Sequence, residues 1–142
     1  MIPGKSSLQL LATLSVFAGL ALLPAPPSKR RGPLAPIASF AATIQWARAD
    51  VAFDEGRLDV GLARAERALE LDPKPSEGWS WLASVLVHRF GAPEFEATPL
   101  SRRTWVEAGL AVLARGEAVS REPEELAFHA GLIMAFVAAL PE

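Results

Sequence analysis

Two histidines, His88 and His129, are the side chains in this chain best suited to hold a metal ion. A metal site needs two or three further ligands at suitable spacing, and the sequence around neither histidine supplies them. His129 stands inside the apolar run LAFHAGLIMAFVAAL, a setting that could also hold a haem or another pigment. We expect instead a histidine that is hydrogen-bonded between helices, with no metal and no cofactor.

Nucleophilic catalysis has equally little support. Ser84 and Ser101 have no companions in the sequence that would complete a triad, and no glycine-rich phosphate loop occurs. The chain contains no cysteine, which excludes disulfides and thiolate metal sites. These residues predict a protein that is not an enzyme and has no small-molecule substrate.

Aromatic side chains are better candidates, because tryptophan often anchors a protein partner. Trp79 and Trp81 are two residues apart, so they cannot share one face of a helix. We expect Trp79 and Trp105 to pack between helices. Trp81 is the candidate for protein binding.

Two adjacent cations, Arg102 and Arg103, come at the expected start of a helix, where the dipole disfavours positive charge. They are candidates for binding an acidic partner or for pairing with Glu94 and Glu96. The alternative is a solvated local pair whose aliphatic stems cover the preceding loop.

The elements that position these residues are predicted to be helical, because no stretch alternates apolar and polar residues over the length of a strand. Gly56, Asp72-Pro73 and Gly91 are typical helix ends, Ser76 is a plausible N-cap, and Pro123 suits a first helical position. Five helices are expected, at residues 37–55, 58–71, 77–90, from 99 or 101 to 116, and 123–140. The fold class is all-α.

A period of about 34 residues runs through this body. Ala49 and Ala83 are 34 residues apart, and small residues suit close helix contacts. Residues 56–59 (GRLD), Ala65 and 68–73 (ALELDP) look like the second half of a tetratricopeptide repeat. Trp79, Leu82 and Ala83 resemble the first half of the next one. The resemblance implies a short array of helical hairpins that binds protein, with an enlarged loop at 91–103.

The N-terminal segment has the character of a membrane helix. Residues 7–23 carry no charge, and they lie between Lys5 and the triplet Lys29-Arg30-Arg31. As a helix they would span about 26 Å, slightly less than the hydrocarbon core of a bilayer. We expect a retained single-pass anchor; a signal peptide, cleaved after Ala21 or less favourably after Ala25, and a buried soluble helix remain alternatives. The chain then divides into a membrane helix at 1–23, a proline-rich basic linker at 24–36 and a helical domain at 37–140.

Charge is distributed unevenly along the chain. No Asp or Glu precedes Asp50, whereas residues 32–142 hold ten Lys and Arg against all sixteen acids. An acidic body argues against binding to nucleic acid. The positive-inside rule, applied to the triplet at 29–31 against Lys5 and the terminal amine, places the body in the cytoplasm by one charge.

A longer pattern is similar to uncharacterised membrane-anchored envelope proteins of bacteria. The matching blocks are residues 46–50, 56–57, Trp79, Trp81 and residues 102–109. Those relatives are mostly extracytoplasmic, so the resemblance implies a body in the periplasm, attached to the inner membrane. Orientation thus stays open between the two arguments.

The last expected helix is apolar on all sides, because His129 is its only polar side chain between Leu126 and Leu140. A chain of this size cannot easily bury every face of such a helix. We expect Phe128, Leu132 and Phe136 to meet another protein, another copy of the chain, or lipid. The favoured function is a non-catalytic accessory or structural subunit of a larger membrane complex. The alternative is an envelope adaptor that holds a peptide or client protein in its repeat groove.

Overall fold

The computed structural model describes residues 34–92, 94–95 and 98–138 of the 142-residue chain. The expected membrane segment at 1–23 lies outside these residues, as do most of the linker and residues 139–140. The helices are α2 (Ala35–Asp54), α3 (Leu58–Leu71), α4 (Ser76–Ser84), the π-helix η1 (Val85–Phe90), α5 (Pro99–Glu117) and α6 (Pro123–Ala138). The described part of the chain contains five α-helices and no strand, which confirms an all-α body. None of these helices is long and apolar enough to cross a bilayer.

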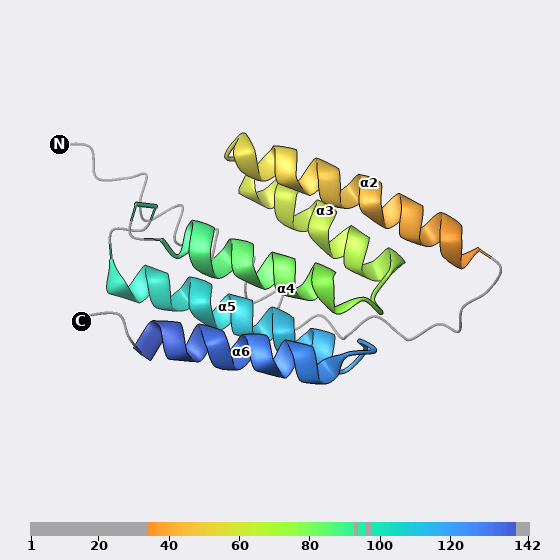
Figure 1. Cartoon of the computed structure of the whole chain (residues 1–142). Coiled ribbons are helices and arrows are strands. Elements are labelled where there is room, and N and C mark those ends of the chain that lie inside the picture. The colour runs from red at the N-terminus through yellow and green to blue at the C-terminus, as the bar shows by residue number, and fades with distance from the viewer. Residues whose placement is uncertain (1–33, 93, 96–97, 139–142) are drawn as a thin grey trace.

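The helices form a stack of antiparallel hairpins (Figure 1). α2 pairs with α3, and α4 with its extension η1 pairs with α5. α6 packs on α5 and α4, and no further helix follows it in the described residues. α2 and α6 therefore lie at opposite edges of the stack (Figure 1).

Helix ends follow the glycine and proline signals of the sequence. Gly56 has φ of +72°, the left-handed conformation in which a residue without Cβ is unstrained, and it makes the turn between α2 and α3. Asp72 ends α3 directly before Pro73, and Gly91 ends η1. Pro123 opens α6 and is followed by two glutamates, which suit the positive end of the helix dipole.

Ser76 is not the N-cap that the sequence predicts. Pro75 holds the capping position, and Ser76 is the first residue of α4. Its hydroxyl is buried and donates a hydrogen bond to the carboxylate of Glu125 at the start of α6. A residue that was expected to begin one helix thus ties two helices together.

The expected helix over 77–90 changes its winding after Ser84. Residues Val85–Phe90 form a π-helix, and the Gly91 amide donates to the Leu86 carbonyl at 3.0 Å. The wider turn still directs Leu86, Val87 and Phe90 into the core. Because the apolar spacing suits either winding, the sequence pattern alone could not distinguish them.

The core lies between the two hairpins and α6, and it depends on small residues at the helix crossings. A Cβ added at Gly61 would lie 2.3 Å from the Phe53 ring, and one at Gly116 would lie 2.6 Å from Trp79 Cγ. Trp79 itself is fully buried, and its indole N–H donates to the Pro73 carbonyl at 2.9 Å. Trp105 is buried as well, so the expected packing of Trp79 and Trp105 between helices is confirmed.

Candidate protein-interaction surface

α6 is held against the body along one narrow stripe. Leu126 and Ile133 are buried in the core, and Ala130 and Val137 are partly buried against it. These positions recur at spacings of three and four residues, so they occupy one face of the helix. Most of the remaining helix surface is exposed; among the described residues, the His88 ring contacts it at Phe136.

The uncovered side of α6 is as apolar as the covered one. Phe128 is 64% exposed, Leu132 51% and Phe136 45%, and their spacing of four residues places them on one side of the helix. We call these three residues the outer face of α6. Met134, which is 58% exposed, lies on another side of the helix. A helix of a water-facing protein normally turns polar residues to its exposed sides. The structure therefore exposes the three residues that the sequence selected as binding candidates, together with Met134.

Polar contacts fix the beginning of α6, so the outer face projects from a rigid base. The Lys74 ammonium donates to the Val119 carbonyl at 3.0 Å, and the Ser120 hydroxyl donates to the Lys74 carbonyl at 3.1 Å. The Arg121 amide donates to the same carbonyl at 3.0 Å. Together with the Ser76–Glu125 bond, these contacts join the loop before α4 to the loop before α6.

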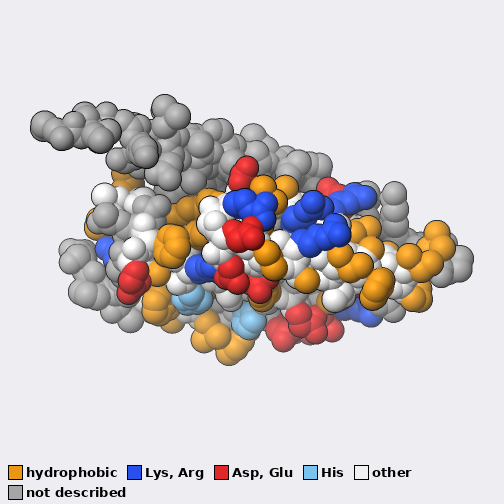
Figure 2. Space-filling model, turned by 90° about the horizontal axis from the view of Figure 1, so that it is seen from above, with side chains coloured by type: hydrophobic (Ala, Val, Ile, Leu, Met, Phe, Trp, Pro, Cys, Tyr) orange, Lys and Arg blue, Asp and Glu red, His pale blue; other side chains and the backbone are white. Residues whose placement is uncertain are grey.

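Both histidines lie beside the outer face of α6. The exposed ring of His88, on η1, meets Phe136 edge to face with ring centroids 5.1 Å apart. His129 is half-buried, and its ring centroid lies 6.4 Å from that of Phe128. Figure 2 shows both histidine side chains among hydrophobic ones. In the described residues no three His, Cys, Asp or Glu side chains group as metal ligands would.

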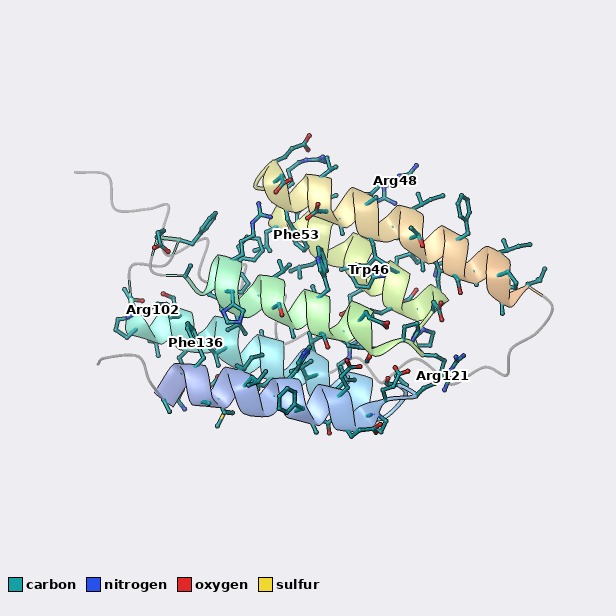
Figure 3. The ribbon with its side chains drawn as sticks, in the orientation of Figure 1. Trp46, Arg48, Phe53, Arg102, Arg121 and Phe136 are labelled. Carbon is teal, nitrogen blue, oxygen red and sulfur yellow. The ribbon has the colours of Figure 1, made fainter. Side chains whose placement is uncertain are left out.

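Trp81 lies between the two hairpins and is half-buried. Its ring meets Trp46 edge to face at 5.1 Å and lies 6.0 Å from Phe53. Both partners come from α2 (Figure 3). The indole therefore has a packing function that the sequence did not specify, and only its remaining surface is open to a partner. Trp79 is fully buried and Trp81 half-buried, as expected for two residues that cannot share one helix face.

The two arginines at the start of α5 differ from each other. Arg103 is exposed and donates through Nε to Glu107 one turn later, at 2.8 Å. Such a surface pair at i, i+4 contributes only about 0.3–0.5 kcal/mol. Arg102 is half-buried, and within the described ranges no ion pair involves it. Figure 3 draws Arg102 at the same end of the stack as Phe136, and Arg121, in the loop after α5, at the opposite end.

Sequence reasoning missed a second apolar surface, on α2. Its apolar positions divide into two sets: Ala42, Ala49 and Phe53 are buried, whereas Ile37 and Phe40 are more than 60% exposed. Both sets have helical spacing, so periodicity alone could not show which one faces the core. The lack of acidic residues before Asp50 was the only sequence signal for this surface.

Comparison of the chain with protein-family models, with curated proteins and with solved structures finds no match.

Proposed function

We propose that this chain is a non-catalytic, membrane-anchored helical scaffold that serves as an accessory or structural subunit of a larger membrane-protein complex. Residues 7–23 supply the anchor in the inner membrane of a bacterium, and the tetratricopeptide-like body projects into the periplasm. The observation that carries the proposal is the outer face of α6. It is an exposed apolar surface on α6, at one edge of the stack.

The size of this surface favours a partner in the same membrane. Full burial of a Phe or Leu side chain is worth about 1.5–3 kcal/mol, and the three side chains of the outer face are roughly half exposed. Their burial would therefore contribute on the order of 3 kcal/mol. Association of two free proteins costs at least about 4 kcal/mol in lost motion, so the surface alone binds weakly. Anchoring both partners in one bilayer lowers that cost, because it raises their effective concentration.

An adaptor with a peptide groove is the less favoured function. Such a groove needs exposed anchors on successive first helices. Trp81, the aromatic candidate on α4, is largely engaged with Trp46 and Phe53. Most of the exposed large apolar side chains lie instead on the two edge helices, and the others are Phe95 in the loop before α5 and Leu100 in the first turn of α5.

Stoichiometry tests the proposal. The full chain, tagged and isolated from native membranes, should retain its partner in a fixed ratio through detergent exchange, as measured by quantitative mass spectrometry. Phe128→Ser with Leu132→Ser should abolish that retention without loss of helix content, because both side chains are exposed. Val51→Ser is the matched control, since Val51 is 53% exposed on the opposite edge.

Two results would overturn the proposal. One is a partner that exchanges freely at micromolar affinity, which would identify an adaptor. The other is an unchanged partner ratio in the Phe128→Ser, Leu132→Ser variant, which would exclude the outer face of α6 as the contact. Protease accessibility of the body in sealed vesicles separately tests the periplasmic orientation.

A further inference from the structure

The exposed apolar side of α2 begins where the helix begins. Ile37 is 64% exposed, Phe40 68% and Ile44 38%, and Leu34, which precedes the helix, is 66% exposed. Spacing of three and four residues places Ile37, Phe40 and Ile44 on one side of the helix, opposite the buried residues Ala42, Ala49 and Phe53. We call these three residues the outer stripe of α2. Hydrophobic side chains gather at the end of the molecule where α2 begins (right in Figure 2).

We propose that the outer stripe of α2 lies in the headgroup region of an anionic bilayer and so holds the body against the membrane surface. The inference rests on the proposed membrane anchor at residues 7–23, and it assigns α2 to lipid and leaves α6 to the protein partner.

The charge at the beginning of α2 fits anionic lipid. The first forty-nine residues contain no acid, and the cations that follow the proposed anchor are Lys29, Arg30, Arg31 and Arg48. Each Lys or Arg near an anionic surface contributes about 1 kcal/mol of attraction. At the other edge of the body the sign is reversed, because Glu122, Glu124 and Glu125 are all exposed where α6 begins. An anionic surface would therefore attract the beginning of α2, before the acids Asp50 and Asp54 near its end, and repel the start of α6.

The length of the linker keeps α2 near the bilayer. Ten residues separate Leu23, the last of the apolar segment, from Leu34. Four of the ten residues at 24–33 are prolines, a composition typical of an extended, semi-rigid spacer. At about 3.1 Å per residue, ten residues in such a conformation would span about 31 Å. α2 is the first helix after the linker, so of all the helices it has the shortest tether.

A second copy of the chain fits the outer stripe of α2 less well. Ile37, Phe40, Ile44, Ala47 and Val51 do follow heptad spacing. These five positions cover only about two heptads, and the small side chain of Ala47 would bury little apolar surface in the middle of a helix pair. In a parallel pair, which two anchors in one bilayer would impose, Asp50 would face Glu55 of the other copy. That flanking repulsion favours lipid over self-pairing.

Site-directed spin labelling tests the inference, and the chain suits it because it has no cysteine of its own. Single variants Ile37→Cys and Phe40→Cys of the full chain carry a nitroxide in vesicles of mixed zwitterionic and anionic phospholipid. For each nitroxide, the rate of collision with oxygen, which concentrates in lipid, is compared with the rate of collision with a water-soluble nickel complex. These two rates are the accessibilities of the label to oxygen and to nickel. At both positions we expect oxygen accessibility to exceed that of nickel.

Controls at exposed sites elsewhere give the reference for water. Asp59→Cys on α3 and Leu132→Cys on α6 should show the opposite ratio, and Leu132 matches the stripe in being an exposed apolar residue. In purely zwitterionic vesicles the ratio of oxygen to nickel accessibility at positions 37 and 40 should fall toward the ratio measured at the control positions.

Three outcomes would overturn the inference. They are a water-like ratio at 40, low accessibility to both reagents at 40 with spin–spin broadening between copies, or a lipid-like ratio at 132. The second would show that the stripe pairs with another copy. A label at Val16→Cys reads the anchor independently. If it is in lipid while position 40 is in water, only the present inference fails; if it is in water, the proposed anchor fails too.

Discussion

At the scale of the residue, glycines decide how closely these helices approach one another. The Cβ that Gly116 lacks would fall 2.6 Å from Trp79 Cγ and 2.8 Å from Leu126 Cδ1. Trp79 cannot move aside easily, because its N–H is bonded to Pro73 and the Arg115 guanidinium lies 5.5 Å from its ring centre. Gly131, on the exposed side of α6, has no atom within 4 Å of that position. The same residue type therefore has opposite consequences at the two sites.

Alanine at these two positions should accordingly change stability in opposite directions. Gly116→Ala should lower the free energy of unfolding by about 1–3 kcal/mol, because it overpacks a rigid contact. Gly131→Ala should raise it by about 0.5–1 kcal/mol, since alanine is the better helix former and meets no obstacle. Urea titration of the two variants and the parent, followed by tryptophan fluorescence, measures both. Equal effects at 116 and 131 would contradict the packing argument.

At the scale of the element, the turn between α2 and α3 depends on one backbone conformation. Gly56 has φ of +72°, yet nothing lies within 4 Å of the Cβ it lacks. Its amide donates to the Phe53 carbonyl at 3.1 Å, and the Arg57 amide donates to Ala52 at 2.8 Å. A substitution there is opposed by backbone strain alone, with no steric contact to confuse the result.

Gly56→Ala should therefore cost about 1–2 kcal/mol, the penalty of the left-handed conformation for a residue with Cβ. Gly56→Asn should cost less, because asparagine tolerates that conformation. Thermal unfolding followed by circular dichroism compares the two variants. A loss as large for asparagine as for alanine would mean that the turn needs glycine for another reason.

The boundaries of the helices could be predicted from the sequence better than the side of each helix that faces the core. Gly56, Pro73, Gly91 and Pro123 placed the helix boundaries close to where they occur, because these residues act on the local backbone. The side of α2 that faces the core is decided by tertiary packing, not by the local sequence. Two apolar stripes compete for one core, and small residues such as Ala42 and Ala49 enter it because they let α3 approach closely. For α6 the sequence did reveal an unmatched face, since a helix without a polar side must leave some apolar surface uncovered.

At the scale of the whole molecule, two arginines add polar contacts to the apolar packing that joins the two hairpins. The Arg115 guanidinium on α5 donates two hydrogen bonds of 2.8 Å to the Glu66 carboxylate on α3. These side chains are only 12% and 15% exposed. Arg89 adds a second link, donating to the Phe53 carbonyl at 3.0 Å and to Asp54 at 2.8 Å.

Removal of one partner of the nearly buried pair should be worse than removal of both. Glu66→Leu leaves the Arg115 charge without its carboxylate and should cost about 3–5 kcal/mol. Glu66→Leu with Arg115→Leu should cost less than the sum of the two single changes, because no unpaired charge remains. Chemical unfolding of all four proteins gives the coupling energy. Strict additivity would show that the pair does not join the hairpins energetically.

Because α2 and α6 lie at opposite edges of the stack, the body fixes the distance between whatever contacts α2 and whatever contacts α6 (Figure 1). Packed helices are spaced about 8–10 Å apart, so the number of hairpins between the edges sets how far a partner on α6 stands from whatever α2 rests on. If α2 rests on the bilayer, that distance is the height of the partner above the membrane. One added hairpin would lift the partner further without altering either contact. Homologues that act at different heights would then differ in hairpin number while keeping the same two edge helices.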